Sequence, residues 1–230
     1  MQKNKENYQK LLFKKIDEIK NSNEKPSLLL HVCCAPCSSA CLDILKEWFN
    51  ITLLFYNPNI QPKEEYFKRQ EELKQFVSEL NQENSQKIQA DILKEIKILD
   101  VEYDPDEFFQ VTKGLENEKE GGKRCRKCFE LRLAKTADIC KKGGYDYFTT
   151  TLTLSPYKDS QLLNEIGKTM QDRFNKQYLF SDFKKNEGYK KSIEYSKKYK
   201  LYRQDYCGCV FSKIEREEQK KQKELNNWYF

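Results

Sequence analysis

Two patterns of hydrophobic positions alternate along this chain. Continuous apolar runs, typical of strands buried on both faces, occur at 27–33 and 51–56. Runs rich in β-branched and aromatic residues predict further strands at 96–103, 147–154 and 178–180. Apolar residues at helical spacing predict the helices, which lie at 8–20, 38–49, 62–80, 124–142 and 159–173, with a short one after residue 105.

This alternation of strands and helices predicts the α/β fold class, with a parallel sheet, helices on both of its faces and a Rossmann-like arrangement. In such sheets, ligands bind beyond the carboxyl ends of the strands. The 230 residues fit a single catalytic domain, 1–230, and residues 213–230 are expected to form a charged helix or tail.

Seven of the nine cysteines fall into three tight groups: Cys33-Cys34-x-x-Cys37, Cys125-x-x-Cys128 and Cys207-x-Cys209. Such spacing holds thiolates close enough to bind one soft metal centre. Seven thiolates exceed the ligand number of one tetrahedral ion, so we expect a multinuclear centre or two neighbouring metal sites. The alternatives are a redox-active dithiol and buried thiols without chemistry.

The places of these groups in the predicted elements favour one shared site. Cys33 and Cys34 end the first strand, and residues 149–155 end a later one. Cys125 and Cys128 open a helix, where backbone N–H groups and the helix dipole favour thiolates. We therefore expect the cysteine groups to meet at one edge of the sheet.

The N-terminal residues are polar, and no apolar run resembling a signal peptide follows them. No stretch approaches the roughly 20 apolar residues of a membrane span. We therefore predict a cytoplasmic protein without a membrane partner, in a compartment where structural disulfides are rare.

Positive charge is concentrated in the segment 184–203. This segment holds eight Lys or Arg and two Glu, a net +6 that equals the formal net charge of the whole chain. Four tyrosines are interleaved with its lysines. Because phosphates attract such charge and unpaired bases stack on tyrosine rings, the segment favours nucleic-acid binding. The alternative is a solvated helix whose tyrosines pack on the core. The candidate contacts are Lys190, Lys191, Lys197, Lys198 and Arg203.

Five motifs follow one another along the chain. They are His31-Val-Cys-Cys-Ala-Pro-Cys-Ser38, Tyr56-Asn-Pro-Asn59, Arg124-Cys-Arg-Lys-Cys-Phe-Glu-Leu-Arg132, Thr149-Thr-Thr-Leu-Thr-Leu-Ser-Pro156 and Tyr202-Arg-Gln-Asp-Tyr-Cys-Gly-Cys-Val-Phe-Ser212. In residues and order they resemble the QueH-type epoxyqueuosine reductases, over residues 25–213. The helix in residues 1–25 and the tail 213–230 lie outside the resemblance. It implies a fold like the adenine-nucleotide α-hydrolase (PP-loop) group. The Ser-Gly-Gly-x-Asp-Ser loop of ATP-using relatives is absent, which argues against adenylation.

The resemblance also implies an activity. It is the removal of the epoxide oxygen of epoxyqueuosine at the wobble position of tRNA, the last step of queuosine biosynthesis, without cobalamin. The implied cofactors are a [4Fe-4S] cluster and a mononuclear iron or other divalent metal. The implied partners are a tRNA with a queuosine-type wobble base and an electron donor that remains to be identified. Two other functions stay open, namely another iron–sulfur tRNA-modifying enzyme of this fold and a non-catalytic zinc-binding module.

The reaction suits the cysteine count, because forming an alkene from an epoxide consumes two electrons and two protons. A cluster passes electrons singly and needs three or four thiolates, and a second iron can accept the oxygen. The candidate ligands are Cys33, Cys34, Cys37, Cys125, Cys128, Cys207 and Cys209. They could divide four and three between the two sites, or three and three with one cysteine left unbound. Cys37, which some relatives replace, is a candidate for the second metal. Cys41 and Cys140 are expected to pack in the core.

Three polar residues of the motifs are the catalytic candidates. His31, the only histidine, is expected to be either a satisfied core histidine or a hydrogen-bond partner or proton relay of the metal site. Asp205 or Tyr206 could deliver a proton, although Asp205 could equally anchor Arg203.

Further polar residues of the motifs have two interpretations each. Arg124 and Arg132 are candidates to hold tRNA phosphate or to offset the negative charge of a cluster. The hydroxyl groups at 149–151 and at Ser155 could bind a ligand or could be satisfied inside a buried strand.

Overall fold

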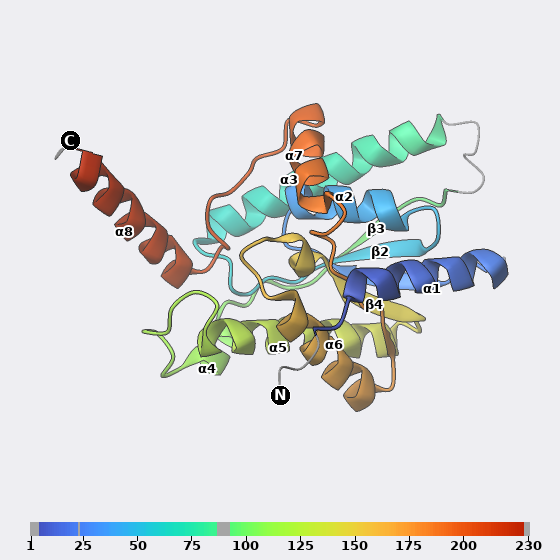
Figure 1. Ribbon diagram of the computed structural model, residues 1–230, viewed down its shortest axis with the longest axis horizontal. Helices are drawn as coiled ribbons and strands as arrows, with labels where there is room; N and C mark the ends of the chain where they lie inside the picture. The colour runs from blue at the N-terminus through green and yellow to red at the C-terminus, as the bar shows by residue number, and fades with distance from the viewer. Residues whose placement is uncertain (1–4, 23, 87–92, 228–230) are drawn as a thin grey trace.

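The chain forms a five-stranded parallel sheet between two layers of helices (Figure 1). The structure is a computed structural model that describes residues 5–22, 24–86 and 93–227. Residues 1–4 of the predicted N-terminal region and residues 228–230 of the predicted tail therefore lie outside the described residues. The strands are β1 (Ser27–His31), β2 (Asn50–Phe55), β3 (Lys97–Asp100), β4 (Tyr147–Thr150) and β5 (Gln177–Tyr178). The helices are α1 (Tyr8–Ser22), α2 (Ala35–Leu45), α3 (Lys63–Ser85), α4 (Asp106–Thr112), α5 (Lys123–Lys142), the 3₁₀ helix η1 (Thr151–Leu154), α6 (Ser160–Phe174), α7 (Gly188–Lys198) and α8 (Val210–Asn227).

The strand order is β3-β2-β1-β4-β5, and every pairing is parallel. The predicted fold class is therefore confirmed. The chain moves outward from β1 to β3 and then returns to the other side of β1 to form β4. The direction of winding reverses between β1 and β4, and such a switch point leaves a crevice at the carboxyl ends of the two strands.

Alternate residues of β1 face the two helical layers, since successive side chains of a strand point to opposite faces. Leu28 and Leu30 belong to a buried cluster with residues of α1, α2 and α3. Leu29 belongs to a second cluster with residues of α5 and α6. Because both faces are covered, the strand reads as the continuous apolar run that predicted it.

Several element boundaries differ from the prediction. The strand expected at 147–154 ends at Thr150, whose side chain accepts a hydrogen bond from the Leu152 N–H and caps the 3₁₀ helix η1. Helix α2 begins at Ala35 instead of residue 38, and Pro36 occupies its first turn, where proline is favoured. Both changes bring polar residues to the carboxyl edge of the sheet.

Helix α8 extends away from the sheet (Figure 1). Its first turns meet α5, where Arg124 pairs with Glu215 at 2.9 Å and lies 4.6 Å from the centre of the Phe211 ring. Within the described ranges, none of the helices combines the length and apolar character that crossing a membrane requires.

Candidate metal centre

The first cysteine group lies directly beyond β1. The Sγ atoms of Cys33, Cys34 and Cys37 all lie within 4.8 Å of one another, and those of Cys33 and Cys34 are 3.8 Å apart. Cys34 is the N-cap of α2, so the amino end of that helix faces the group and favours negative charge there. These three thiols can hold one metal ion.

The second and third groups lie together beside the first. Cys125 and Cys128 are in the first turns of α5, and Cys207 and Cys209 precede α8, with their Sγ atoms 3.6 Å apart. All four line a cavity of about 110 Å³. Backbone N–H groups point at two of the sulfurs, from Gly121 to Cys125 and from Ser212 to Cys209. Such bonds stabilise thiolates.

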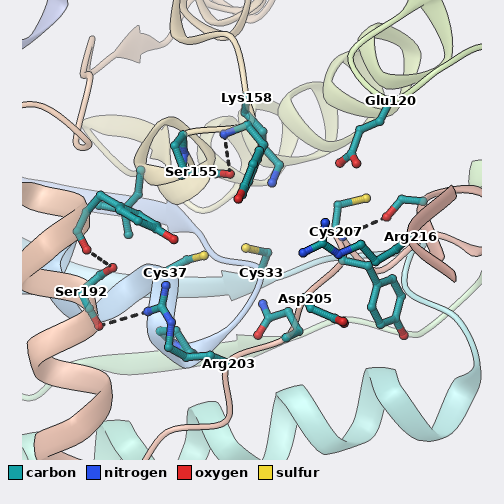
Figure 2. Close-up of a pocket in the computed structure, with 18 of the residues that line it drawn as sticks. Cys33, Cys37, Glu120, Ser155, Lys158, Ser192, Arg203, Asp205, Cys207 and Arg216 are labelled. Carbon is teal, nitrogen blue, oxygen red and sulfur yellow. Dashed lines mark hydrogen bonds between the residues drawn. The ribbon is translucent and has the colours of Figure 1, made fainter. Parts of the chain in front are cut away.

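A larger cavity of about 390 Å³ adjoins this one, and its wall includes Cys33, Cys37 and Cys207. Figure 2 shows the sulfurs of Cys33 and Cys37 pointing toward each other, with Cys207 on the other side of the same pocket. Four residues line both cavities: Cys207, Glu120, Tyr157 and Lys158. The prediction that the cysteine groups meet at one sheet edge is therefore confirmed.

The pKa values of the thiols differ within this site. Hydrogen bonds from Cys34 and Cys37 lower the pKa of Cys33, whereas burial raises the pKa of Cys34 to about 12. A hydrogen bond from Cys209 likewise lowers the pKa of Cys207. Cys33 and Cys207 are therefore the thiols of the two close pairs that lose their protons most readily.

Arg132 is a buried cation, only 3 % exposed, beside these thiols. Its guanidinium donates to Asn57 Oδ1 at 2.6 Å and to His31 Nε2 at 3.2 Å, and it lies 4.0 Å from Cys128 Sγ. In the described part of the chain, no carboxylate pairs with it. A buried charge without a counterion is costly, so thiolates are the natural counterions of Arg132. This arrangement fits a thiolate-bound metal centre.

His31 holds Arg132 in place. The Nε2 atom lies 3.2 Å from Arg132 Nε and 3.1 Å from the Tyr56 carbonyl oxygen, and Nδ1 lies 2.8 Å from Thr150 Oγ1. Burial, aided by the charge of Arg132, lowers the pKa of His31 to about 3. His31 is fully buried and lines neither cavity. This placement favours the interpretation of His31 as a satisfied core histidine that positions Arg132 over a catalytic role.

The burial of Arg124 and Arg132 favours the charge-offsetting interpretation over the predicted contacts with tRNA phosphate. Arg124 is 1 % exposed, and it donates to Glu215 and to backbone carbonyl oxygens, those of Glu116 and Glu118 among them. Neither residue is exposed on the surface where a tRNA backbone would lie. Arg124 instead ties the loop between α4 and α5 to helix α8.

Asp205 and Tyr206 both line the larger cavity. Asp205 pairs with Lys220, whose hydrogen bond lowers the pKa of the carboxyl group, so it stays ionised near neutral pH and is a poor proton donor. Asp205 does not anchor Arg203, which donates to Ser192 O and Ser196 Oγ. Burial raises the pKa of Tyr206 to about 12, so its hydroxyl keeps its proton and donates to Gln61 O at 3.1 Å.

The hydroxyl groups after β4 divide between the two interpretations. Thr149 Oγ1 donates to Leu179 O at 2.7 Å, and Thr150 bonds to His31. Both are fully buried, so they are satisfied strand residues. Ser155 lines the larger cavity.

Sequence reasoning missed Lys158 and Glu120, which border both cavities (Figure 2). Burial opposes the charge of Lys158, but the thiol groups of Cys33, Cys207 and Cys37 outweigh it and raise the pKa of the lysine. Burial, together with Cys207, raises the pKa of Glu120. Lys158 lies only two residues beyond the motif ending in Pro156, which was the available signal.

The basic segment lies on α7 and the loop that follows it. Lys190, Lys191, Lys197 and Lys198 are all exposed. Lys190 pairs with Glu187, and Lys198 pairs with Glu83. The candidate contacts therefore form an accessible surface, although two of them already have acidic partners.

The tyrosines of the basic segment serve different purposes. Tyr195 and Tyr199 pack against the core, where the Tyr199 ring lies 5.1 Å from Phe76. For these two residues the core interpretation is confirmed. Tyr189 instead lines the larger cavity, beside Arg203.

Cys41 and Cys140 are core residues, as predicted. Both side chains are fully buried in hydrophobic clusters, and the Cys41 thiol donates to the Cys37 carbonyl oxygen. Neither lines the two cavities.

The fold and site define a Rossmann-like α/β protein with a cysteine triad that could bind a metal at the switch point of its sheet. Residues 28–215 match the family model described as epoxyqueuosine reductase QueH. A protein of Staphylococcus epidermidis with that name is 44 % identical over 92 % of this chain and 87 % of its own length. Similar proteins of the same name occur in Streptococcus pyogenes (43 % identical; 90 % and 78 % covered) and Thermotoga maritima (34 %; 84 % and 93 %). The chain belongs to the QueH family.

Proposed function

We propose that this protein is an epoxyqueuosine reductase, which converts epoxyqueuosine to queuosine at the wobble position of tRNA without cobalamin. The observation that carries the proposal is the pair of adjoining cysteine-lined cavities, of about 390 and 110 Å³, in a chain of this family. The larger cavity is of the size that accommodates small ligands.

The cysteines divide naturally between two metal sites. The four that line the smaller cavity, Cys125, Cys128, Cys207 and Cys209, would hold a [4Fe-4S] cluster, which is typically bound by four thiolates. The triad of Cys33, Cys34 and Cys37 would hold a mononuclear iron or other divalent metal, since three ligands leave a position for substrate. When bound, these metals supply the electrons and the Lewis acid that opening an epoxide requires.

The reaction also needs protons at a defined place. Forming an alkene from an epoxide consumes two electrons and two protons and releases the oxygen as water. Lys158 lies where the two cavities meet. We therefore assign its ammonium group as the donor that forms a hydrogen bond with the epoxide oxygen. Tyr206, on the wall of the larger cavity, is protonated at neutral pH and would be a second proton donor once its hydroxyl turned away from the Gln61 carbonyl oxygen.

Exposed residues around the larger cavity suit an RNA loop. Tyr157 is 76 % exposed at the boundary of the cavities and offers a stacking face to an unpaired base. Helix α7 contributes Tyr189 and Ser192 to the cavity wall and carries lysines on its exposed side. The wobble nucleotide would enter the cavity, and its neighbours would lie along α7.

Nucleoside analysis tests the proposal directly. Transfer RNA from cells lacking this protein should accumulate epoxyqueuosine, and expression of the intact chain should restore queuosine. The anaerobically purified protein, supplied with a chemical reductant but neither cobalamin nor ATP, should convert epoxyqueuosine in tRNA. Unchanged queuosine in the deleted strain would refute the proposal. A colourless protein containing only zinc would favour a non-catalytic zinc module.

A further inference from the structure

Glu120 differs from the other acidic residues of the larger cavity. The wall of that cavity carries three carboxylates: those of Glu120, Asp205 and Glu215. Glu215 pairs with Arg124, and Asp205 pairs with Lys220. Among the described residues, Glu120 forms no salt bridge. Figure 2 shows its carboxylate near Lys158 and Cys207. Glu120 lines both cavities and so lies at their boundary.

The loop that carries Glu120 is held in place by hydrogen bonds to Arg124 and Glu215. Arg124 donates to three carbonyl oxygens of this loop, those of Leu115, Glu116 and Glu118. The Glu120 N–H donates to Glu215 Oε2 at 3.1 Å. The carboxylate is therefore presented to the cavity by a fixed backbone, as a preorganised binding group requires.

The substrate of the proposed function carries a positive charge of its own, and this inference rests on that function. The epoxide ring of epoxyqueuosine is joined to its deazaguanine base through a secondary alkylamine, which is protonated at neutral pH, as a lysine side chain is. Since the epoxide has to reach the metal-binding cysteines, the amine must lie about one ring diameter away from them. A carboxylate at the boundary of the cavities is suited to bind it.

We propose that Glu120 binds the protonated amine of the modified wobble base and thereby determines specificity for amine-bearing nucleosides. The contact would be a charge-assisted hydrogen bond, which is stronger than a neutral one. Unmodified guanosine lacks the amine, so Glu120 would give no affinity for a loop carrying it. Lys158, which faces the thiol groups, would meanwhile hydrogen-bond the epoxide oxygen.

The test compares three anticodon stem–loops that differ only at the wobble base: guanosine, 7-aminomethyl-7-deazaguanosine and queuosine. Dissociation constants are measured by fluorescence anisotropy on the anaerobically purified, metal-containing full chain. The intact protein should bind both amine-bearing loops about tenfold or more tightly than the guanosine loop. Glu120→Gln should reduce that preference to nearly onefold and leave the affinity for the guanosine loop unchanged.

A matched control is Glu218→Gln, which makes the same charge change on the exposed face of α8, outside both cavities. It should behave like the intact protein. Metal content, measured in every variant, separates loss of the amine contact from loss of the site. A Glu120→Gln protein that keeps both its metal and the full preference would overturn the inference.

Failure of this inference is distinguishable from failure of the proposed function. The intact protein is assayed in parallel for conversion of epoxyqueuosine in tRNA. Conversion together with a preference that does not depend on Glu120 refutes only the amine contact. A Glu120-dependent preference without conversion supports the amine contact and refutes the reductase.

Discussion

At the scale of single residues, the site is organised by buried cations that face sulfur. Arg132 has no carboxylate partner among the described residues, and its neighbours are His31, Asn57 and Cys128. A buried guanidinium is stabilised only if the surrounding groups carry negative charge. Thiolates bound to metal carry that charge at neutral pH without depending on the individual thiol pKa values.

The first prediction concerns the cysteines. Cys125→Ala or Cys209→Ala should lower the iron content and abolish reduction of epoxyqueuosine, because each removes one of the four thiols around the smaller cavity. Iron and acid-labile sulfide are measured after anaerobic purification. Cys140→Ala is the control, since this thiol lies in the core cluster and outside both cavities. Unchanged iron and activity in either of the first two variants would refute the assignment.

The second prediction concerns Lys158. Lys158→Met should slow single-turnover reduction by about 100-fold, the usual contribution of one positioned proton donor or hydrogen-bond donor. Lys158→Arg should keep part of the rate, because it retains a cationic donor. Neither variant should lose iron, since the lysine is not a ligand. A rate that falls only in proportion to iron content would show instead that Lys158 supports the metal site.

Sequence reasoning performed unevenly at this scale. It found the cysteine groups because their spacing is a local property of the chain. It left two interpretations open for Arg124 and Arg132, because burial depends on which loops cover a side chain, and their burial favours the charge-offsetting interpretation over a contact with tRNA. It missed Glu120 because the position of that carboxylate depends on the loop held by Arg124 and on α8, which is distant in sequence.

At the scale of elements, the ends of strands and helices create the site. The period of the hydrophobic pattern predicted the strands and most of the helices, since both faces of the sheet are buried. The hydrophobic pattern did not predict that the strand after Tyr147 becomes a 3₁₀ helix at Thr151. The change is caused by a side-chain hydrogen bond of Thr150, which leaves the hydrophobic pattern unaltered. This early turn directs the following segment, with Ser155 and Lys158, toward the cysteines.

The third prediction concerns the turn between Cys207 and Cys209. Gly208 has φ +118°, and an added Cβ would lie 2.8 Å from Ile60 Cγ1 and 3.1 Å from Arg69 Nη1. Gly208→Ala should therefore destabilise the protein by about 1–3 kcal/mol and lower its iron content, because the two thiols would be displaced. Thermal unfolding and metal analysis measure both effects.

Gly114→Ala is the matched control for this turn. Gly114 also has a positive φ, of +80°, but an added Cβ would meet nothing within 4 Å. Gly114→Ala should lower the thermal stability through backbone strain, but it should not lower the iron content. Equal iron content in the two variants would mean that the close approach at Gly208 does not position the cysteines.

At the scale of the whole molecule, helix α7 contributes both to the wall of the larger cavity and to the basic surface. Helix α7 packs against α2, whose amino end carries the first cysteine group. Tyr189 and Ser192 of α7 line the larger cavity, while its lysines are exposed. An RNA loop that inserts one nucleotide into the cavity would therefore place neighbouring phosphates near α7.

The last prediction follows from the pairing of these lysines. Lys190 and Lys198 already have carboxylate partners, whereas Lys191 and Lys197 form no salt bridge among the described residues. Lys191→Gln with Lys197→Gln should weaken tRNA binding at low salt. The slope of log Kd against log salt should fall by roughly 1.5, at about 0.7–0.9 for each phosphate contact. Iron content should not change, since neither lysine lines a cavity.

The control pair is Lys141→Gln with Lys168→Gln, on helices α5 and α6, which cover the opposite face of the sheet. If both pairs show the salt dependence of the intact protein, α7 is only a solvated face, and tRNA must reach the cavity along another surface, for which α8 and its exposed lysines are the next candidate.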